Sequence, residues 1–508
     1  MSASAWSVAL LGADGVLVEV EAALGAGLPR TVLVGLPDTA LYEARDRCRA
    51  AVAGAGLAWP AQLLTINLTP ASLPKSGSHY DLAIVAAVLA CSKIVPSQIA
   101  ASSVLLGELG LDGRVRRVNG VLPALLAARK AGFDRAIVPA EQLAEAELVA
   151  GMTVWGAANL SDLVEILHGR PGADRIVAPS AVPEDSVDLK DLNDVRGQAE
   201  AVQALIVAAA GGHHLLLHGA PGVGKTMLAE RLPGLLPQLS VEESLEVSAL
   251  HSLVGHDLNR GLITRRPYSA PHHNATVPSL IGGGSKIAKP GAISLAHRGV
   301  LFLDEAAEFS PQCLDALRTP LESGQVTIAR SQGMVRFPAR FQLVMATNPC
   351  PCGRYGSFSG QPCSCAPFAI RRYQQRLSGP IVDRMDIQVH MQGELQGMAE
   401  SQLTAAPDSA SVVEQVTVAR ERQRHRLEEL DCSTNAEVPG PQLRKMTLPD
   451  GWRLVEAGLA RGEISARGVD KVLRVAWTVA DLAGHDVPTK QDLMTAYAMR
   501  RSDQAVAA

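Results

Sequence analysis

The 508-residue sequence predicts an α/β fold built on a parallel sheet, followed by an α-helical region. Three observations support this prediction. A glycine-rich loop stands between an apolar run at 215–217 and a helical segment at 227–231. A second apolar run, at 300–303, ends in Asp304 and Glu305. Beyond about residue 393, strand-like runs fade and helical patterns appear. Alternating strands and helices favour a parallel sheet whose faces are covered by helices.

Composition restricts the class of protein. The chain is too long for one ordinary core, so several domains are expected. Acidic residues number 51 and basic residues 47, so any surface for nucleic acid must be local. The first residues lack the basic-then-apolar pattern of a signal peptide, and no apolar run is long enough to span a bilayer. Eight cysteines in so long a chain do not suggest a disulfide framework. We therefore expect a protein of the reducing cytoplasm that has no membrane partner.

The order of elements divides the chain into four segments. Residues 1–168 alternate β-like runs with helical ones, which is typical of an α/β or α+β domain. Glycine, proline and acidic residues dominate 169–190, which we interpret as a linker. Residues 191–392 carry the parallel-sheet core. Residues 393–508 form the helical region, with helical patterns at 412–429 and 469–482.

The glycine-rich loop has the G-x-x-x-x-G-K-T pattern of a phosphate-binding loop. Its glycines let successive backbone N–H groups point into one concavity, and the next helix adds the positive end of its dipole. Lys225 is expected to reach the β- and γ-phosphates, and the Thr226 hydroxyl to bind Mg²⁺. The predicted nucleotide-binding residues of the loop are Gly219, Ala220, Pro221, Gly222, Val223, Gly224, Lys225 and Thr226.

Polar residues at the ends of two further strands extend this site. Asp304 is expected to hold the Mg²⁺ bound by Thr226, and Glu305 to orient and polarise the attacking water. A third strand, at 342–346, is followed by Asn348, whose amide can hydrogen-bond the water or the γ-phosphate. Ordinary buried strands also end in acids, and Asn348 is also a common turn residue. The run that ends in Asp304 and Glu305 follows a complete phosphate-binding loop by about 80 residues, which favours the functional assignment.

Segments around these strands resemble the AAA+ ATPases, and among them the ATPase subunit of magnesium chelatase. VRGQ at 195–198 precedes an alanine-rich helix, as the adenine-proximal box of AAA+ proteins does. The chelatase-like segments are RPY at 266–268, PHHN at 271–274, LIGGG at 280–284, PGAISLAH at 290–297 and LRTPLESG at 317–324. The whole chain is similar to the ComM/YifB family. That resemblance implies a hexameric ring with a helical lid that hydrolyses ATP with Mg²⁺ and drives DNA branch migration.

The N-terminal region resembles the proteolytic domain of Lon. The matching segments are LPKSG at 73–77, GELGLDGRV at 107–115, NGVL at 119–122 and AARKAG at 127–132. Lon proteases use a serine activated by a lysine. His79 aligns with that serine and Leu122 with that lysine. A pair rebuilt from Ser76, Ser78 and Lys75 stays an alternative, but a fold that has lost this chemistry is the preferred interpretation.

The AAA+ resemblance also implies two functional arginines. SGPIVDRMD at 378–386 matches the segment that carries the arginine finger, which makes Arg384 the group that reaches a neighbouring subunit's nucleotide. A surface ion pair with Asp383 or Asp386 is the alternative. SAR at 465–467 opens a helix that resembles the sensor-2 segment of the lid. Arg467 is the preferred sensor, with Arg474 as the second choice.

Four of the eight cysteines form a C-x-C, ten-residue, C-x-C cluster. Cys350, Cys352, Cys363 and Cys365 can supply a tetrahedral zinc shell, although C-x-x-C is the commoner spacing. Buried thiols or a redox pair are the alternatives.

A predicted β-hairpin at 326–340 provides candidate DNA contacts. In this AAA+ branch such a hairpin points into the central pore, where Arg330 and Arg336 would contact phosphates. Lys286 lies in an insertion at 264–297 that forms a second candidate loop. A solvated charged face is the alternative for each residue. The rival functions are a motor that remodels a metal-chelatase partner and a chaperone- or protease-like AAA+ machine.

Overall fold

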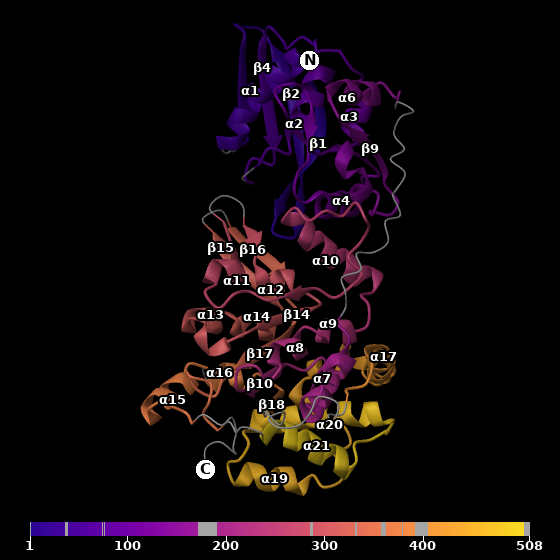
Figure 1. The fold of residues 1–508 in the computed structure, drawn as a ribbon. Coiled ribbons are helices and arrows are strands. Elements are labelled where there is room, and N and C mark those ends of the chain that lie inside the picture. The colour runs from indigo at the N-terminus through magenta and orange to yellow at the C-terminus, as the bar shows by residue number, and fades with distance from the viewer. Residues whose placement is uncertain are drawn as a thin grey trace.

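In the computed structural model, residues 2–35, 39–73, 75, 77–170, 190–284, 288–330, 333–356, 362–377, 379–391 and 405–501 are described. Figure 1 shows three parts along the long axis of the molecule: an N-terminal domain at one end, a central region, and a helical region at the other end. The predicted linker lies almost wholly outside the described residues. Within them, no helix combines the length and the hydropathy needed to cross a membrane.

The N-terminal domain is organised around a seven-stranded mixed sheet with the order β3-β4-β2-β1-β5-β8-β9. The first two strands form a long antiparallel hairpin, and the pairs β1·β5, β5·β8 and β8·β9 are parallel. The strands are β1 (Ser2–Leu11), β2 (Asp14–Gly25), β3 (Arg30–Val34), β4 (Leu63–Thr69), β5 (Val104–Leu105), β8 (Arg135–Pro139) and β9 (Thr153–Ala157); β6 (Glu108–Leu109) and β7 (Val115–Arg116) make a separate ribbon. The prediction of an α/β or α+β domain is confirmed.

Helices supply the rest of the N-terminal core. All eleven residues of α2 (Asp81–Cys91) are buried: the last ten are apolar, and Asp81 pairs with Arg47 over 2.6 Å. The other helices are α1 (Thr39–Gly54), α3 (Ser97–Ser102), α4 (Val121–Lys130), α5 (Leu143–Ala146) and α6 (Leu160–Leu167).

The central region contains a five-stranded sheet with the order β11-β14-β17-β10-β18, and every pairing in it is parallel. The strands are β10 (Leu215–Gly219), β11 (Tyr268–Ser269), β14 (Val300–Leu303), β17 (Gln342–Thr347) and β18 (Ile387–Met391). The first three residues of β10 and all of β14 and β17 are buried, which explains their continuous apolar runs. The predicted parallel sheet is therefore confirmed.

Helices and two short hairpins surround this sheet. The helices are α7 (Ala199–Gly211), α8 (Lys225–Ala229), α9 (Leu232–Leu235), α10 (Val241–Leu253), α11 (Val277–Ile281), α12 (Ala292–Leu295), α13 (Pro311–Ala316), α14 (Arg318–Ser323), α15 (Pro367–Gln374) and α16 (Gly379–Val382). One hairpin pairs β12 (Gly282–Gly283) with β13 (Lys289–Pro290), and the other pairs β15 (Gln325–Arg330) with β16 (Gly333–Pro338).

The C-terminal helices pack on the same core as α7. They are α17 (Ser409–Arg426), α18 (Gly440–Leu443), α19 (Arg453–Ala460), α20 (Ala466–Ala483) and α21 (Lys490–Arg501). One apolar cluster joins Val207 of α7, Val416 of α17 and Val472 of α20. The helices predicted at 412–429 and 469–482 correspond to α17 and α20.

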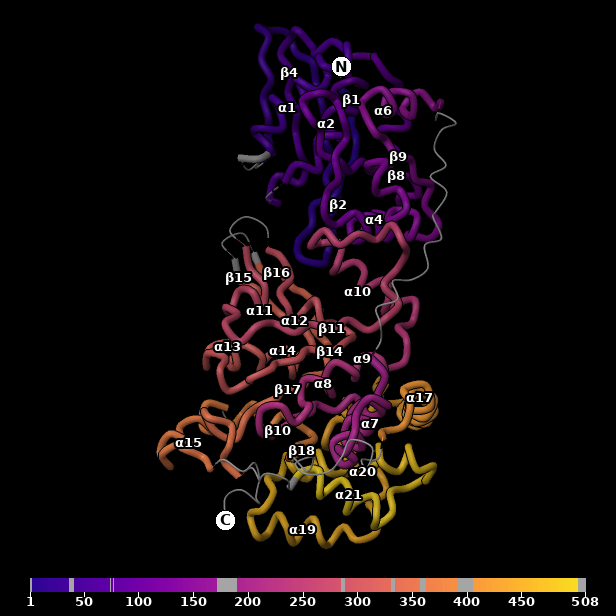
Figure 2. Tube along the Cα trace, in the orientation of Figure 1, coloured from indigo at the N-terminus to yellow at the C-terminus, as the bar shows by residue number. Residues whose placement is uncertain are grey.

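The N-terminal domain is docked on the central region through α4 and α10. Leu125 and Ala249 belong to one apolar cluster. The Ser252 hydroxyl donates to the Glu145 carboxylate over 2.6 Å, and the Gly120 N–H donates to the Ser252 carbonyl over 3.1 Å. Figure 2 shows the indigo turn between β1 and β2 descending toward β16.

Candidate nucleotide-binding site

Parallel neighbours in the central sheet bring three strand ends together. In the register, Leu217 of β10 lies beside Ala346 of β17, and Leu303 of β14 lies beside Met345 of β17. The residues that follow these strands consequently meet at one edge of the sheet, where open α/β folds bind their ligands.

The phosphate-binding loop joins β10 to α8 and requires glycine at two positions. Gly222 and Gly224 have φ values of +80° and +95°, in the left-handed region that other residues rarely adopt. At Gly219 a Cβ atom would lie 2.6 Å from the Met391 carbonyl oxygen, so the loop also packs closely against β18. The backbone therefore curls before α8 begins at Lys225, as phosphate binding at a helix N-terminus requires.

Lys225 points back across the loop and connects it to the third strand. Its Nζ donates to the carbonyls of Gly219 and Ala220 over 2.7 and 2.9 Å, and to Oδ1 of Asn348 over 3.0 Å. Burial lowers the pKa of Lys225 to about 8, although the nearby carboxylates of Asp304 and Glu305 oppose the shift. A phosphate bound in this loop would replace the carbonyls as the partner of the ammonium group and favour its charged form. The structure thus brings Lys225 and Asn348 together.

Thr226 and Asp304 meet in the geometry expected of a shared metal site. The Thr226 hydroxyl donates to Oδ2 of Asp304 over 2.8 Å, while Oδ1 accepts from the Glu305 N–H over 2.9 Å. One hydroxyl and one carboxylate are the hard oxygen ligands that Mg²⁺ takes beside nucleotide phosphates. These two residues fit the ion, which would screen the phosphate charge in the reaction.

Glu305 has a contact that sequence reasoning missed. It has φ +50°, and its Oε2 lies 3.1 Å from Nδ1 of His273, with half of the carboxylate side chain exposed. His273 comes from the chelatase-like segment at 271–274, so the resemblance pointed to the segment without giving this residue a role. A carboxylate in this position can accept a proton from water, and His273 fixes where it points.

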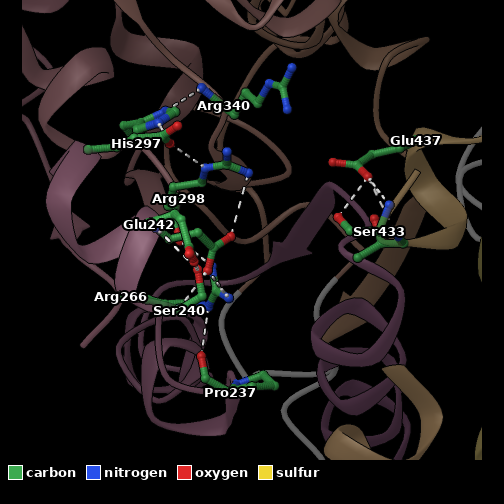
Figure 3. A network of polar contacts seen from close by, with 12 residues as sticks. Pro237, Ser240, Glu242, Arg266, His297, Arg298, Arg340, Ser433 and Glu437 are labelled. Atoms are coloured by element: carbon green, nitrogen blue, oxygen red, sulfur yellow. Dashed lines mark hydrogen bonds and ion pairs between the residues drawn. The ribbon is translucent and has the colours of Figure 1, made fainter. Parts of the chain in front are cut away.

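A network of polar contacts holds the residues that precede β11 and β14 (Figure 3). Arg266 donates to the carbonyls of Pro237 and Arg298 over 2.7 and 2.8 Å. Glu246 of α10 accepts from His297 and Arg298, each over 3.1 Å, and the His297 contact lowers the pKa of Glu246 to about 2. Arg266, part of the insertion considered for DNA, is therefore an internal anchor.

The predicted finger, Arg384, contacts α14 and the segment around α16 in its own chain. Its guanidinium pairs with Glu322 at the end of α14 and donates to the Pro380 carbonyl over 2.8 Å. The side chain is 17% exposed. Pairing with Asp383 or Asp386, the alternative considered from the sequence, is not the contact observed.

The helix α20 places the two sensor candidates differently. Arg467 is 71% exposed and lies 3.5 Å from Asp383, whereas Arg474 donates to the Val438 carbonyl over 2.9 Å. On the same helix, the buried Lys471 donates to Oδ1 of Asp386 and to the Arg384 carbonyl, each over 2.7 Å. Sequence reasoning missed Lys471, which connects the helical region to the segment that carries Arg384.

The four clustered cysteines come together immediately after Asn348. The Sγ atoms of Cys350, Cys352 and Cys363 lie 3.4, 3.5 and 3.7 Å apart, and with Cys365 all four lie within 4.8 Å of one another. The Tyr355 N–H donates to the Cys350 sulfur over 3.3 Å. A hydrogen bond from the Arg354 backbone lowers the pKa of Cys352 to about 6. The four clustered cysteines form no disulfide with one another.

Comparison with known proteins agrees with this geometry. Family models described as magnesium chelatase, subunit ChlI, match 191–398 and, for its C-terminal part, 406–500; a third, subunit ChlI of Mg-chelatase, matches 20–142. The competence protein ComM of Haemophilus influenzae is 42% identical over 94% of this chain and 93% of its own. YifB of Escherichia coli is 41% identical over 98% and 96%, and an uncharacterized Mycobacterium tuberculosis protein is 51% identical over 98% of both chains. The chain belongs to the ComM/YifB family of magnesium chelatase-like proteins.

Membership in the ComM/YifB family implies ATP and Mg²⁺ as ligands and ATPase activity, and AAA+ proteins commonly form oligomers. The hairpin expected in the family is present as β15 and β16, with Arg336 exposed opposite Thr327. The side chain of Arg330 and all of Lys286 lie outside the described residues. A Cβ at Gly12 would lie 2.5 Å from the Arg336 carbonyl oxygen, so the N-terminal domain contacts the hairpin directly.

Proposed function

We propose that the protein is a ring-forming ATPase that couples ATP hydrolysis to DNA translocation and branch migration. This proposal rests on one observation. The hairpin β15–β16, which carries the arginines, follows directly after α14, and Glu322 of α14 pairs with Arg384. The strand β15 begins two residues after α14 ends. Movement of Arg384 toward a neighbouring nucleotide would release Glu322 and so affect the base of the hairpin. One relative is named the competence protein ComM, and the proposal takes up the DNA-related role that the family resemblance implies.

In this proposal, residues of two neighbouring subunits take part in the hydrolysis of one ATP. Thr226 and Asp304 hold Mg²⁺, Lys225 binds the phosphates, Glu305 polarises the attacking water, and Asn348 positions the γ-phosphate. Arg384 of one subunit neutralises charge on the nucleotide of the next, and Arg467 contributes from the helical lid. A hexameric ring supplies the required neighbour, because a heterologous interface that closes forms a ring.

DNA contacts are assigned to Arg336, Arg330 and Lys286. These contacts act on phosphates, so they are independent of sequence and weaken with salt. Branched or single-stranded DNA is the proposed substrate.

The test measures ATP hydrolysis with and without branched DNA and follows strand exchange on a labelled junction. Stimulation by the junction and strand exchange are expected, and both should vanish in Lys225→Ala and Glu305→Gln. Arg336→Ala should weaken DNA binding and lower the salt slope by about one. Arg45→Ala is the matched control, since Arg45 is an exposed arginine paired with Asp46 on the N-terminal domain. Unstimulated hydrolysis together with absent DNA binding would overturn the proposal.

The second candidate is a protein-remodelling motor of the metal-chelatase or chaperone type. The match to the magnesium chelatase family model over 191–398 favours it. ATPase stimulation by a protein partner, with no response to DNA, would support this function instead.

We also infer that Cys350, Cys352, Cys363 and Cys365 bind one zinc ion. Zn–S bonds of about 2.3 Å in a tetrahedron separate the sulfurs by about 3.8 Å. The observed separations of 3.4 to 3.7 Å are close to this value, and far above the roughly 2.05 Å of a disulfide. Metal analysis of the purified protein should find one zinc per chain.

A further inference from the structure

The four-cysteine cluster is built directly onto the nucleotide-binding site. Cys350 follows Asn348 by two residues, and Asn348 accepts a hydrogen bond from Lys225 over 3.0 Å. The loop between the first two and the last two cysteines contains Gly353. A Cβ at Gly353 would lie 2.3 Å from Cδ and 2.5 Å from Cγ of Pro221, in the phosphate-binding loop. The cysteine segment is therefore connected to the phosphate-binding loop twice. Gly353 packs against Pro221, and Asn348, just before the first cysteine, accepts a hydrogen bond from Lys225.

The contact requires glycine for two reasons. Gly353 has φ +75°, which disfavours side chains, and the space that a Cβ would fill is occupied by the Pro221 ring. Such close approach leaves the phosphate-binding loop little room to move toward the cluster. The loop itself is flexible by composition, with glycines at 219, 222 and 224. Its position consequently depends on what supports Pro221.

Gly353 is connected to the cluster through the backbone, because its N–H donates to the Cys350 carbonyl over 2.9 Å. In the sequence, Cys350 and Cys352 precede the connecting loop. Cys363 and Cys365 follow it, just before α15. A hydrogen bond of 3.2 Å from Gln374 of α15 to the Pro349 carbonyl is a further link across the cluster. One metal ion bonded to four sulfurs would fix this whole arrangement, whereas four separate thiols at these distances contribute little cohesion.

We infer that zinc bound by the four cysteines holds the nucleotide-binding loop in place, so that the affinity for ATP depends on the metal. The effect passes through the contact of Gly353 with Pro221 and the hydrogen bond between Asn348 and Lys225. This inference rests on the zinc site proposed above. The ion would take no part in hydrolysis. It would act by holding Pro221 and Asn348 where the loop binds phosphates. The cofactor class is a single tetrahedral thiolate-bound metal ion, distinct from the Mg²⁺ that accompanies ATP.

Two glycine variants separate bracing from metal binding. Gly353→Ala keeps all four thiols but drives a methyl group into Pro221. Gly356→Ala is the matched control, because Gly356 lies in the same loop with φ +69° and nothing within 4 Å of its Cβ position. Zinc content is measured by mass spectrometry and ATP affinity by fluorescence of a labelled ATP analogue. We expect one zinc per chain in both variants, and an ATP dissociation constant raised at least tenfold only in Gly353→Ala.

Removal of the metal provides the second arm of the experiment. The unmutated chain is treated with a zinc chelator and then reloaded with zinc, and helical content is followed by circular dichroism. A reversible loss of ATP affinity of at least tenfold, with helical content kept, is expected. The double variant Cys352→Ser, Cys365→Ser should behave as the stripped protein does, while Cys432→Ser should not.

Three results would overturn the inference. They are absence of zinc from the purified chain, an unchanged ATP dissociation constant after zinc removal, and equal ATP affinities of the two glycine variants. All of these measurements are made without DNA. Their outcome is therefore independent of whether branch migration, the proposed function, is found.

Discussion

The N-terminal domain and the central region each bury a lysine in a loop, and the two lysines have different surroundings. Lys225 is 8% exposed and donates to two loop carbonyls and to Asn348. Lys75 is fully buried and donates to the Gly35 carbonyl over 3.1 Å and to the Pro70 carbonyl. Burial and carbonyl partners are thus common to both. What differs is the chemistry within reach of each ammonium group.

Around Lys225 the structure provides a concave backbone, two carboxylates and an amide. Around Lys75, no hydroxyl or thiol among the described residues is hydrogen-bonded to the ammonium group. Ser78 is paired with Glu108, and His79 contacts the Val8 carbonyl over 2.9 Å. Leu122, aligned with the Lon lysine, is fully buried. We therefore interpret Lys225 as a catalytic residue and Lys75 as a structural one. Ser76, the other serine of the alternative Ser/Lys pair, lies outside the described residues.

The largest effect is expected from Lys225→Ala. Loss of the ammonium group removes the main cation for the phosphates, so ATP binding should weaken strongly and hydrolysis should fall by roughly 1,000-fold or more. A coupled phosphate-release assay measures the rate. Lys190→Ala, which removes an exposed lysine paired with Glu230, is the control and should keep the unmutated rate. Substantial hydrolysis by Lys225→Ala would contradict the role assigned to this lysine.

Arg384→Ala should reduce turnover by about 1,000-fold while leaving ATP binding intact. The physical reason is that the arginine acts on a neighbour's nucleotide and contacts Glu322 in its own chain. Mixing this variant with Glu305→Gln sharpens the test, because a ring of both types contains some interfaces with an intact Glu305 and an intact Arg384. Partial recovery of activity on mixing is expected. Normal hydrolysis by Arg384→Ala alone would show that the finger assignment is wrong.

The same comparison shows what the sequence could and could not predict. The ends of three parallel strands are specified by local patterns, so Lys225, Thr226, Asp304 and Asn348 were predicted, and the structure places them together. His273 and Gly353 could not be assigned a role from the sequence, because their contacts with Glu305 and Pro221 come from segments distant in the chain. Such contacts form only when distant segments pack together in the folded chain, so no local sequence pattern predicts them.

Acidification should destabilise the central region more than the N-terminal domain. Burial lowers the pKa values of His213 and His214 to about 4, and His214 Nδ1 accepts from the Leu343 N–H over 3.0 Å, which requires a neutral ring. The unfolded chain takes up these protons at about pH 6.5 and the folded chain only near pH 4, so stability is lost as pH falls through this window. Burial raises the pKa of Asp81 in the N-terminal domain, so protonation of this carboxyl favours the folded state as pH falls.

By about pH 4, each histidine is expected to have lowered the free energy of unfolding by roughly 3 kcal/mol. Thermal unfolding from pH 7 to pH 4 measures the total, and hydrogen exchange corrected for pH assigns it to peptides. His213→Asn should reduce the slope. Equal losses in both regions would contradict the proposed origin of the effect.

The smallest effect on activity is expected from Lys75→Met. The substitution keeps the length of the side chain but leaves the carbonyls of Gly35 and Pro70 without their donor, at a cost of about 1–3 kcal/mol in the stability of the N-terminal domain. The rate of ATP hydrolysis should stay within about twofold of the unmutated value, since the contacts described for Lys75 all lie within the N-terminal domain. Thermal unfolding and the phosphate-release assay are run on the same preparation. A peptidase activity that Lys75→Met abolishes would restore the Ser/Lys alternative. A loss of hydrolysis as large as that of Lys225→Ala, with the fold intact, would mean that the two buried lysines serve one catalytic cycle.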